Sequence, residues 1–160
     1  FNVVKYLVEQ GANMETKDDN EMTPLLVLAD MGWQELNVPF YSLAIKQGSV
    51  DIVKYLFEQG ANKEVRDINN RTVFHLAAKQ GHLEIVKFLV EQSTDMEAVD
   101  NANWTPLHYA ANKGYISIVK YLVEHGANKD AKGDNEMTPL LVATGDNAGE
   151  IVQYLQVTQL

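Results

Sequence analysis

The residues of this sequence that are best suited to chemistry are two histidines in the same local context. His75 and His108 each follow a threonine by three residues, Thr72 and Thr105. Two imidazoles could bind one metal ion together, or could act as a general acid and a general base. Either chemistry requires both rings to reach one ligand or substrate atom, so the elements that carry them decide between these uses and a structural role.

Other catalytic patterns are not present in the sequence. It has no Gly-rich phosphate loop of the GxxxxGK(S/T) kind, and no Ser, His and acidic residue form a recognisable nucleophile motif. The segments NRT at 70–72 and NWT at 103–105 match the acceptor pattern of N-glycosylation. The acidic residues are scattered along the chain, as on a charged surface. We therefore predict no enzymatic activity, no cofactor and no metal site.

The composition excludes several further classes. Of 160 residues, 46% are hydrophobic and 22% charged, which is typical of a folding chain and not of a disordered one. The net charge of −9 argues against a nucleic-acid partner, which would need clustered Lys and Arg. There is no Cys for disulfides or thiolate metal sites, and no apolar run approaches the roughly 20 residues of a membrane span. We expect a cytoplasmic protein without nucleic-acid binding or membrane insertion.

The two histidines belong to segments that recur with a fixed step, which we call the repeat step. The nine residues DNEMTPLLV occur twice, at 19–27 and 134–142. Between these copies, Gly48, Gly81 and Gly114 follow one another at equal intervals. The same interval separates the segments IVKYL, IVKFL, IVKYL and IVQYL, which start at Ile52, Ile85, Ile118 and Ile151. A period of this length, about 33 residues, is typical of a chain built from stacked repeats.

The pattern of each repeat predicts a tight turn followed by two helices. LHYAANKG is short and Ala-rich and ends on Gly114, a typical helix stop. DNANWT predicts a tight hairpin, since Asp and Asn favour turns. Thr105 and Pro106 then suit the N-cap and first turn of a helix. YISIVKYLVEHG predicts a second helix, because one of its faces collects the apolar residues Ile116, Val119, Leu122 and Val123.

Several of these motifs together resemble a known repeat family. TPLHYAA at 105–111, followed by Gly114, IVKYL and GAN, is similar to the ankyrin repeat, and TVFHLAAKQGHLEIVKFLVEQ at 72–92 is a second strong copy. TPLLVLADMG at 23–32 and TPLLVATGDN at 138–147 are weaker copies that lack the His. The resemblance covers essentially the whole chain. It implies an all-α fold, an ankyrin-repeat solenoid of stacked helix-turn-helix units joined by β-hairpin loops.

The resemblance also implies structural roles for the residues singled out above. It assigns the two histidines to hydrogen bonds with neighbouring hairpins, and one repeat of separation places their rings about 10 Å apart, too far to share an ion. The family usually has Gly two residues before the Thr, in a turn with positive φ. Asn70 and Asn103 occupy that position, and we favour this turn over glycosylation because Asn tolerates positive φ. Glu21 and Glu136 occupy the same position in the outer units, and for these units the sequence does not predict the hairpin geometry.

The register divides the chain into units, and one interval between units is too short. From Gly32 to Gly48 the chain advances by only about half a repeat step, which leaves the register about 17 residues short of the family period. Either most of one second helix and a hairpin are deleted, or a stretch between about residues 37 and 39 is missing from the sequence. We favour the latter, and a measured intact mass distinguishes the two. The chain starts at Phe1 inside an expected helix, so we expect the gene product to begin upstream. We predict a partial repeat at 1–13, an irregular or abbreviated repeat at 14–37, regular repeats at 38–62, 63–95 and 96–128, and a C-terminal capping repeat at 129–160.

The resemblance further predicts a binding surface. Ankyrin repeats bind partners on a concave face of hairpins and first-helix ends, and Trp and Arg are enriched among binding hot spots. Trp104 is the most prominent position, because nothing in the repeat core requires a large ring at a hairpin tip. The alternative is that Trp104 packs across the adjacent hairpin. The predicted stripe comprises Asp19, Asn20, Met22, Ile68, Asn69, Arg71, Asn101, Ala102, Trp104, Asp134, Asn135 and Met137 from the hairpins, and Lys46, Gln47, Lys79, Gln80, Asn112 and Lys113 from the helix ends.

We therefore expect a non-catalytic scaffold, a monomeric domain that binds another protein or a peptide on this stripe. Its mixed charge, with a Trp near the middle, suits a polypeptide better than a nucleic acid. One alternative is a targeting or autoinhibitory ankyrin segment of a larger enzyme or effector, which a catalytic domain upstream in the reading frame would favour. Another is a purely structural spacer. The sequence does not identify the partner, because one fold serves many functions.

Overall fold

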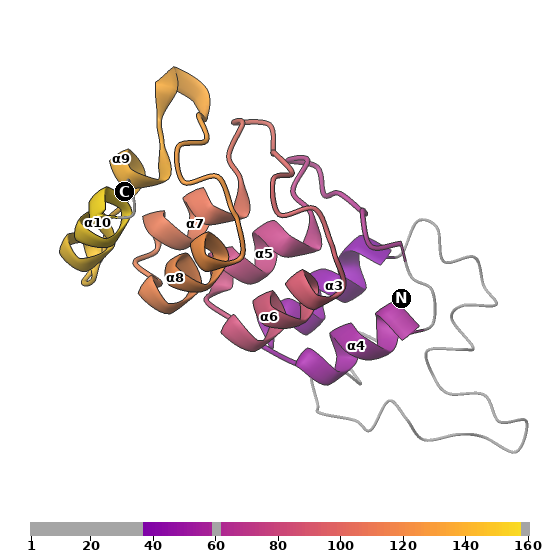
Figure 1. Ribbon diagram of the computed structural model, residues 1–160. Helices are drawn as coiled ribbons and strands as arrows, with labels where there is room; N and C mark the ends of the chain where they lie inside the picture. Colours follow the sequence, from indigo (N-terminus) through magenta and orange to yellow (C-terminus); the bar gives the residue numbers. More distant parts are fainter. Residues whose placement is uncertain (1–36, 59–61, 158–160) are drawn as a thin grey trace, which may run out of the picture.

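The protein forms a row of helix pairs (Figure 1). The computed structural model describes residues 37–58 and 62–157. No helix in this part of the chain has the length and apolar character that a membrane span needs. The helices are α3 (Asn37–Lys46), α4 (Val50–Glu58), α5 (Val73–Gln80), α6 (Leu83–Glu91), α7 (Pro106–Asn112), α8 (Ile116–Glu124), α9 (Pro139–Val142) and α10 (Ala148–Val157), with a short 3-10 turn, η2 (Asp134–Glu136).

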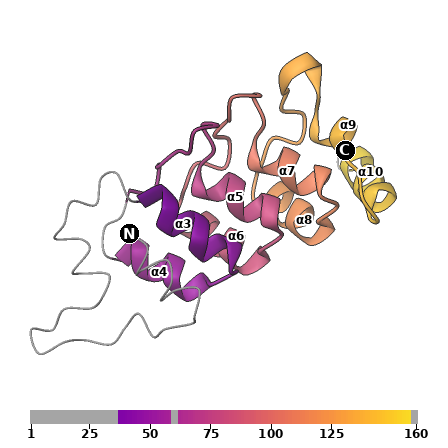
Figure 2. The same ribbon diagram turned by 180° about the vertical axis from the view of Figure 1, so that it is seen from behind.

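The helices form two rows. The first helices of the pairs, α3, α5, α7 and α9, pack on one another in chain order, and the second helices, α4, α6, α8 and α10, do the same. Within each pair the two helices also pack together. The two opposite views show this regular progression from α3 to α10 (Figures 1 and 2). The arrangement confirms the predicted all-α solenoid.

The core lies between the two rows and continues from unit to unit. Val119 and Leu122 on the predicted inner face of α8 are fully buried, while Ile116 and Val123 are half-buried against the core. The first helices contribute small side chains that let neighbouring helices approach closely. Four of these are fully buried: Ala77, Ala78, Ala110 and Ala111.

The glycines that mark the repeat step lie against a side chain of the following unit. Gly48 and Gly81 have φ of 68° and 83°, the left-handed region that favours Gly. A Cβ on Gly48 would lie 2.8 Å from Cε1 of His82, and one on Gly81 would lie 2.7 Å from Cζ of Tyr115. These positions therefore require Gly both for the turn of the backbone and for the side chain of the following unit.

Hairpin-shaped loops precede α5, α7 and α9 and extend from one edge of the helix rows (Figure 1). In each loop a backbone N–H donates to the carbonyl oxygen four residues further on, at 3.0 Å for Asp67, 3.1 Å for Asp100 and 2.8 Å for Gly133. The described part of the chain contains no β-strand, and its one isolated bridge joins Arg66 and Thr72. The loops are therefore tight turns held by few bonds each.

The turn positions predicted from Asn are left-handed. Asn70 has φ 63° and Asn103 has φ 55°, and their side-chain amides donate to groups of the neighbouring hairpin. The threonines of both NxT segments are buried. The turn is thus the better explanation of these segments than glycosylation. In the last hairpin Glu136 is left-handed too, with φ 59°, and Asn135 before it has φ 55°, so this loop differs from the other two.

The two histidines connect each unit to the next one. The backbone N–H of Thr72 donates to Nδ1 of His75 (3.1 Å), so the ring proton lies on Nε2, which donates to the carbonyl of Trp104 (2.9 Å). His108 repeats both bonds, with the equivalent threonine at 3.1 Å and the carbonyl of Met137 at 3.0 Å. Both rings are fully buried. The hydrogen-bonding role is confirmed, and the described residues contain no group of three His, Cys, Asp or Glu that could hold a metal ion.

Some predictions concern residues outside the described part. The partial repeat at 1–13, nearly all of the irregular repeat at 14–37, and the start of the short interval at Gly32 lie there, as do the stripe residues Asp19, Asn20 and Met22. The unit boundaries and the C-terminal cap stay predictions.

Replacing Leu122 by Ala should lower the free energy of unfolding by roughly 2–5 kcal/mol, because the side chain is fully buried between the rows. Val157, which is 64% exposed on α10, provides the control, and Val157→Ala should change it by no more than about 0.5 kcal/mol. Urea unfolding of both variants measures the contrast. Equal losses would show that inside and outside are assigned wrongly.

Stability should fall as the pH drops below the ordinary histidine pKa of 6.5. Burial lowers the pKa of His75 and of His108, while the carbonyl bond at Nε2 acts in the opposite direction. Between pH 6.5 and the lower folded pKa values, the unfolded chain binds more protons than the folded chain. The stability contributed by the neutral histidines is therefore fully present above pH 6.5 and is lost as the pH falls through the folded pKa values.

Urea unfolding at a series of pH values from about 7.5 to about 5 measures this loss. His108→Gln should make the slope of stability against pH shallower, whereas Val157→Ala, which changes no titratable group, should leave it unchanged. A slope that His108→Gln does not alter would contradict the assignment.

Candidate binding face

The predicted stripe lies along the hairpins and the adjoining helix ends. We call this surface the hairpin face: residues 67–71, 100–104 and 133–137, with the C-terminal ends of α3, α5 and α7. The row of hairpins is fixed by bonds between neighbours. The Asn101 N–H donates to the Asn69 carbonyl (3.1 Å), and the Asp134 N–H donates to the Ala102 carbonyl (3.0 Å). These bonds hold the tips at constant spacing.

An aspartate closes each of the first two hairpins from within. Oδ1 of Asp67 accepts the backbone N–H groups of Asn69 and Arg71, both at 2.9 Å. Asp100 accepts the equivalent two bonds in the next hairpin, at 2.8 and 2.9 Å. Because a short aspartate side chain mimics a backbone turn in this way, the local sequence itself fixes these loops.

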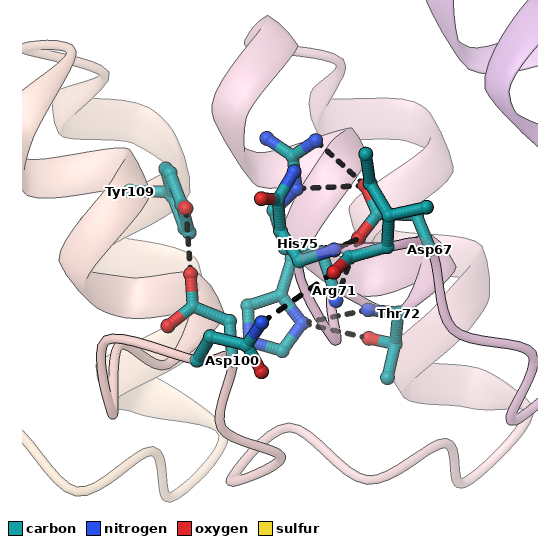
Figure 3. A network of polar contacts seen from close by, with 9 residues as sticks. Asp67, Arg71, Thr72, His75, Asp100 and Tyr109 are labelled. Atoms are coloured by element: carbon teal, nitrogen blue, oxygen red, sulfur yellow. Dashed lines mark hydrogen bonds and ion pairs between the residues drawn. The ribbon is translucent and has the colours of Figure 1, made fainter.

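Polar side-chain contacts lie on both sides of the boundary between the first two hairpins, which the backbone bond from Asn101 to Asn69 crosses (Figure 3). Nη2 and Nε of Arg71 donate to Oδ2 of Asp67 at 2.6 and 2.8 Å. On the other side, the hydroxyl of Tyr109 donates to Oδ2 of Asp100 at 2.7 Å. Figure 3 shows Arg71 and Tyr109 above the buried His75, one on each side of the boundary between the units.

The charges in this network are held in defined states. Burial alone would raise the pKa of Asp67, but the hydrogen bonds and charge of Arg71 and the backbone bonds bring it below its usual value. Burial, together with the bond to Asp100, raises the pKa of Tyr109 to about 12. At neutral pH the network therefore holds an ionised Asp67–Arg71 pair and a protonated Tyr109.

Trp104 packs on its own unit and across the adjacent hairpin. Its ring stacks on His108 with centroids 5.8 Å apart, and meets Tyr109 edge to face at 5.2 Å. A Cβ on Gly133 would lie 2.7 Å from Cδ1 of Trp104, so this glycine leaves room for the indole. The packing that we weighed against a binding role is thus present, and the half-buried ring still contributes to the surface.

Sequence reasoning missed Tyr109. Its ring meets that of Trp104 edge to face, and Nζ of Lys79 lies over it, 5.5 Å from the ring centroid. The available signal was a change of residue type, because the equivalent positions hold the aliphatic Leu76 and Val142. Tyr109 and Trp104 thus place two aromatic rings on the hairpin face, beside the cation of Lys79.

The other predicted residues are distributed over the face. Ile68 is 96% exposed at its hairpin tip. Met137 is partly buried against the core. The side-chain amide of Asn112 donates to the carbonyl of Val142 at 3.3 Å. Ala102 is half-buried. The exposed positions are Asn69, Asn101, Asp134 and Asn135 on the hairpins and Lys46, Gln47, Gln80 and Lys113 at the helix ends.

Comparison with models of protein families supplies an independent assignment. The model described as ankyrin repeats (3 copies) matches residues 41–133 and 99–158. No curated protein matches the sequence significantly. Since the two matches together span well over half of the chain and coincide with the stacked helix pairs, the chain belongs to the ankyrin repeat family.

Proposed function

We propose that this chain is a non-catalytic module that binds a polypeptide partner on its hairpin face. Ankyrin repeats are generally protein–protein interaction modules and are typically non-catalytic. The observation that carries the assignment to this face is Ile68, a large apolar side chain that is 96% exposed at a hairpin tip. The equivalent positions in the next two hairpins hold the polar Asn101 and Asp134. An isoleucine there contributes nothing to the core, so contact with a partner explains this residue better than packing within the chain does.

The rigidity of the face supports the same function. Hydrogen bonds between neighbouring hairpins and the two histidine bonds beneath them fix the tips before a partner arrives. A preorganised surface loses less conformational entropy on binding than a flexible loop does. The half-buried rings of Trp104 and Tyr109 add an aromatic area of the kind that is enriched at interfaces.

Replacing Ile68 by Asp should weaken partner binding at least about tenfold, because the substitution places a carboxylate where an apolar contact is expected. Val157→Asp provides a matched control, since Val157 is also an exposed aliphatic residue but lies on α10, away from the hairpins. Both variants should keep the wild-type free energy of unfolding within about 0.5 kcal/mol.

The measurement compares proteins retained from a lysate of the source organism on immobilised wild type, Ile68→Asp and Val157→Asp, quantified by mass spectrometry. Proteins that bind wild type and Val157→Asp but not Ile68→Asp support the proposal. If Ile68→Asp, Trp104→Ala and Arg71→Ala all retain the same proteins as wild type, the hairpin face is not the binding surface and the structural-spacer hypothesis is favoured.

A further inference from the structure

Lysines mark the C-terminal ends of successive first helices on the hairpin face. Lys46 lies at the end of α3, Lys79 near the end of α5, and Lys113 caps α7. A helix dipole favours a cation at such an end, which explains a lysine on an exposed helix terminus. It does not explain why Lys79 is half-buried with its ammonium over the ring of Tyr109.

The carboxylates nearest to Lys79 are already engaged. Asp67 accepts the guanidinium of Arg71 and two backbone N–H groups. Asp100 accepts the hydroxyl of Tyr109 and two backbone N–H groups. Neither Lys79 nor Lys113 forms an ion pair with another residue of the described part, where the salt bridges involve other groups. The two ammonium groups are therefore available to an external anion.

The ammonium group of Lys79 is repelled by the neighbouring cations of Arg71 and Lys113. Burial lowers the pKa of the Lys79 ammonium, and the like charges of Arg71 and Lys113 act in the same direction, against the weaker opposite effect of Asp67 and Asp100. Lys79 lies in the last turn of α5 and Lys113 caps the C-terminal end of α7, and these two helices pack against each other. A carboxylate that reaches both ammonium groups would relieve the repulsion and gain charge-assisted hydrogen bonds. The aromatic pair of Trp104 and Tyr109 adjoins the same point, so an apolar side chain next to that carboxylate would also find a surface.

We infer that the partner presents an acidic polypeptide segment, in which a carboxylate contacts Lys79 and Lys113 and a neighbouring apolar side chain packs on Trp104 and Tyr109. This inference rests on the proposed function and adds the chemistry of the partner. The net charge of the chain is −9, so most of its surface repels such a segment and the lysines of the hairpin face confine it to one place.

The test uses a displayed library of short random peptides, selected on the immobilised full chain. Peptides that survive selection should be enriched in Asp and Glu relative to the unselected library. One such peptide, labelled with fluorescein, is then titrated by fluorescence anisotropy against the variants. Its affinity should fall at least about tenfold on Lys79→Gln combined with Lys113→Gln, and should recover substantially on Lys79→Arg combined with Lys113→Arg.

A matched control carries the same change of charge elsewhere. Lys54→Gln combined with Lys87→Gln removes two lysines from α4 and α6 in the other helix row, and should leave the affinity within about twofold. Equal losses in both double variants, or selected peptides without an excess of Asp and Glu, overturn the inference. So does binding of an oligothymidylate that depends on Lys79 and Lys113, because it would assign the cations to a nucleic acid.

The same experiment separates this inference from the proposed function. Selected peptides that are not acidic, but lose affinity for Ile68→Asp, would leave the hairpin face as the binding surface and reject only the acidic partner. Selected peptides whose affinity is unchanged by Ile68→Asp and by Lys79→Gln combined with Lys113→Gln would reject the hairpin face as the binding surface, and with it the inference.

Discussion

A buried imidazole that donates a hydrogen bond to a carbonyl of the following hairpin joins one unit of this protein to the next. His75 reaches the carbonyl of Trp104, and His108 reaches that of Met137. Each ring also accepts the N–H of its own helix cap, so a single side chain fixes a helix start, a loop and the distance between units. An imidazole can do this only when it is neutral and carries its proton on Nε2. Burial favours the neutral form, and the threonine N–H that donates to Nδ1 selects the tautomer. The remaining contacts between hairpins depend on the spacing that these bonds set.

The hairpin face inherits its geometry from this framework. Trp104 and Met137, whose carbonyls receive the histidine bonds, are themselves residues of the face. Their side chains are thus oriented by the same backbone segments that hold the stack together. This coupling explains why polar groups at the edge of the helices, such as Arg71 and Tyr109, can hold fixed positions although they lie outside the core.

Much of this architecture could be predicted from the sequence, because it depends on local rules that recur in each repeat. Gly81 marks a helix end, Asn70 and Asn103 mark left-handed turns, and Leu122 lies on the buried face as expected. What could not be predicted depends on contacts between units. The approach of Lys79 to the ring of Tyr109 is a contact between α5 and α7, and no pattern within one repeat encodes it.

The fit of Trp104 against Gly133 has a consequence for how such a chain can evolve. The position of Gly133 holds an aspartate in the two preceding units, Asp67 and Asp100, where its carboxylate closes the hairpin. A duplicated copy of the unit that carries Trp104, inserted directly after the original, would set the indole against an aspartate in place of the glycine. The repeat units are therefore not interchangeable, and shuffling or duplicating them would require a compensating substitution at the new junction.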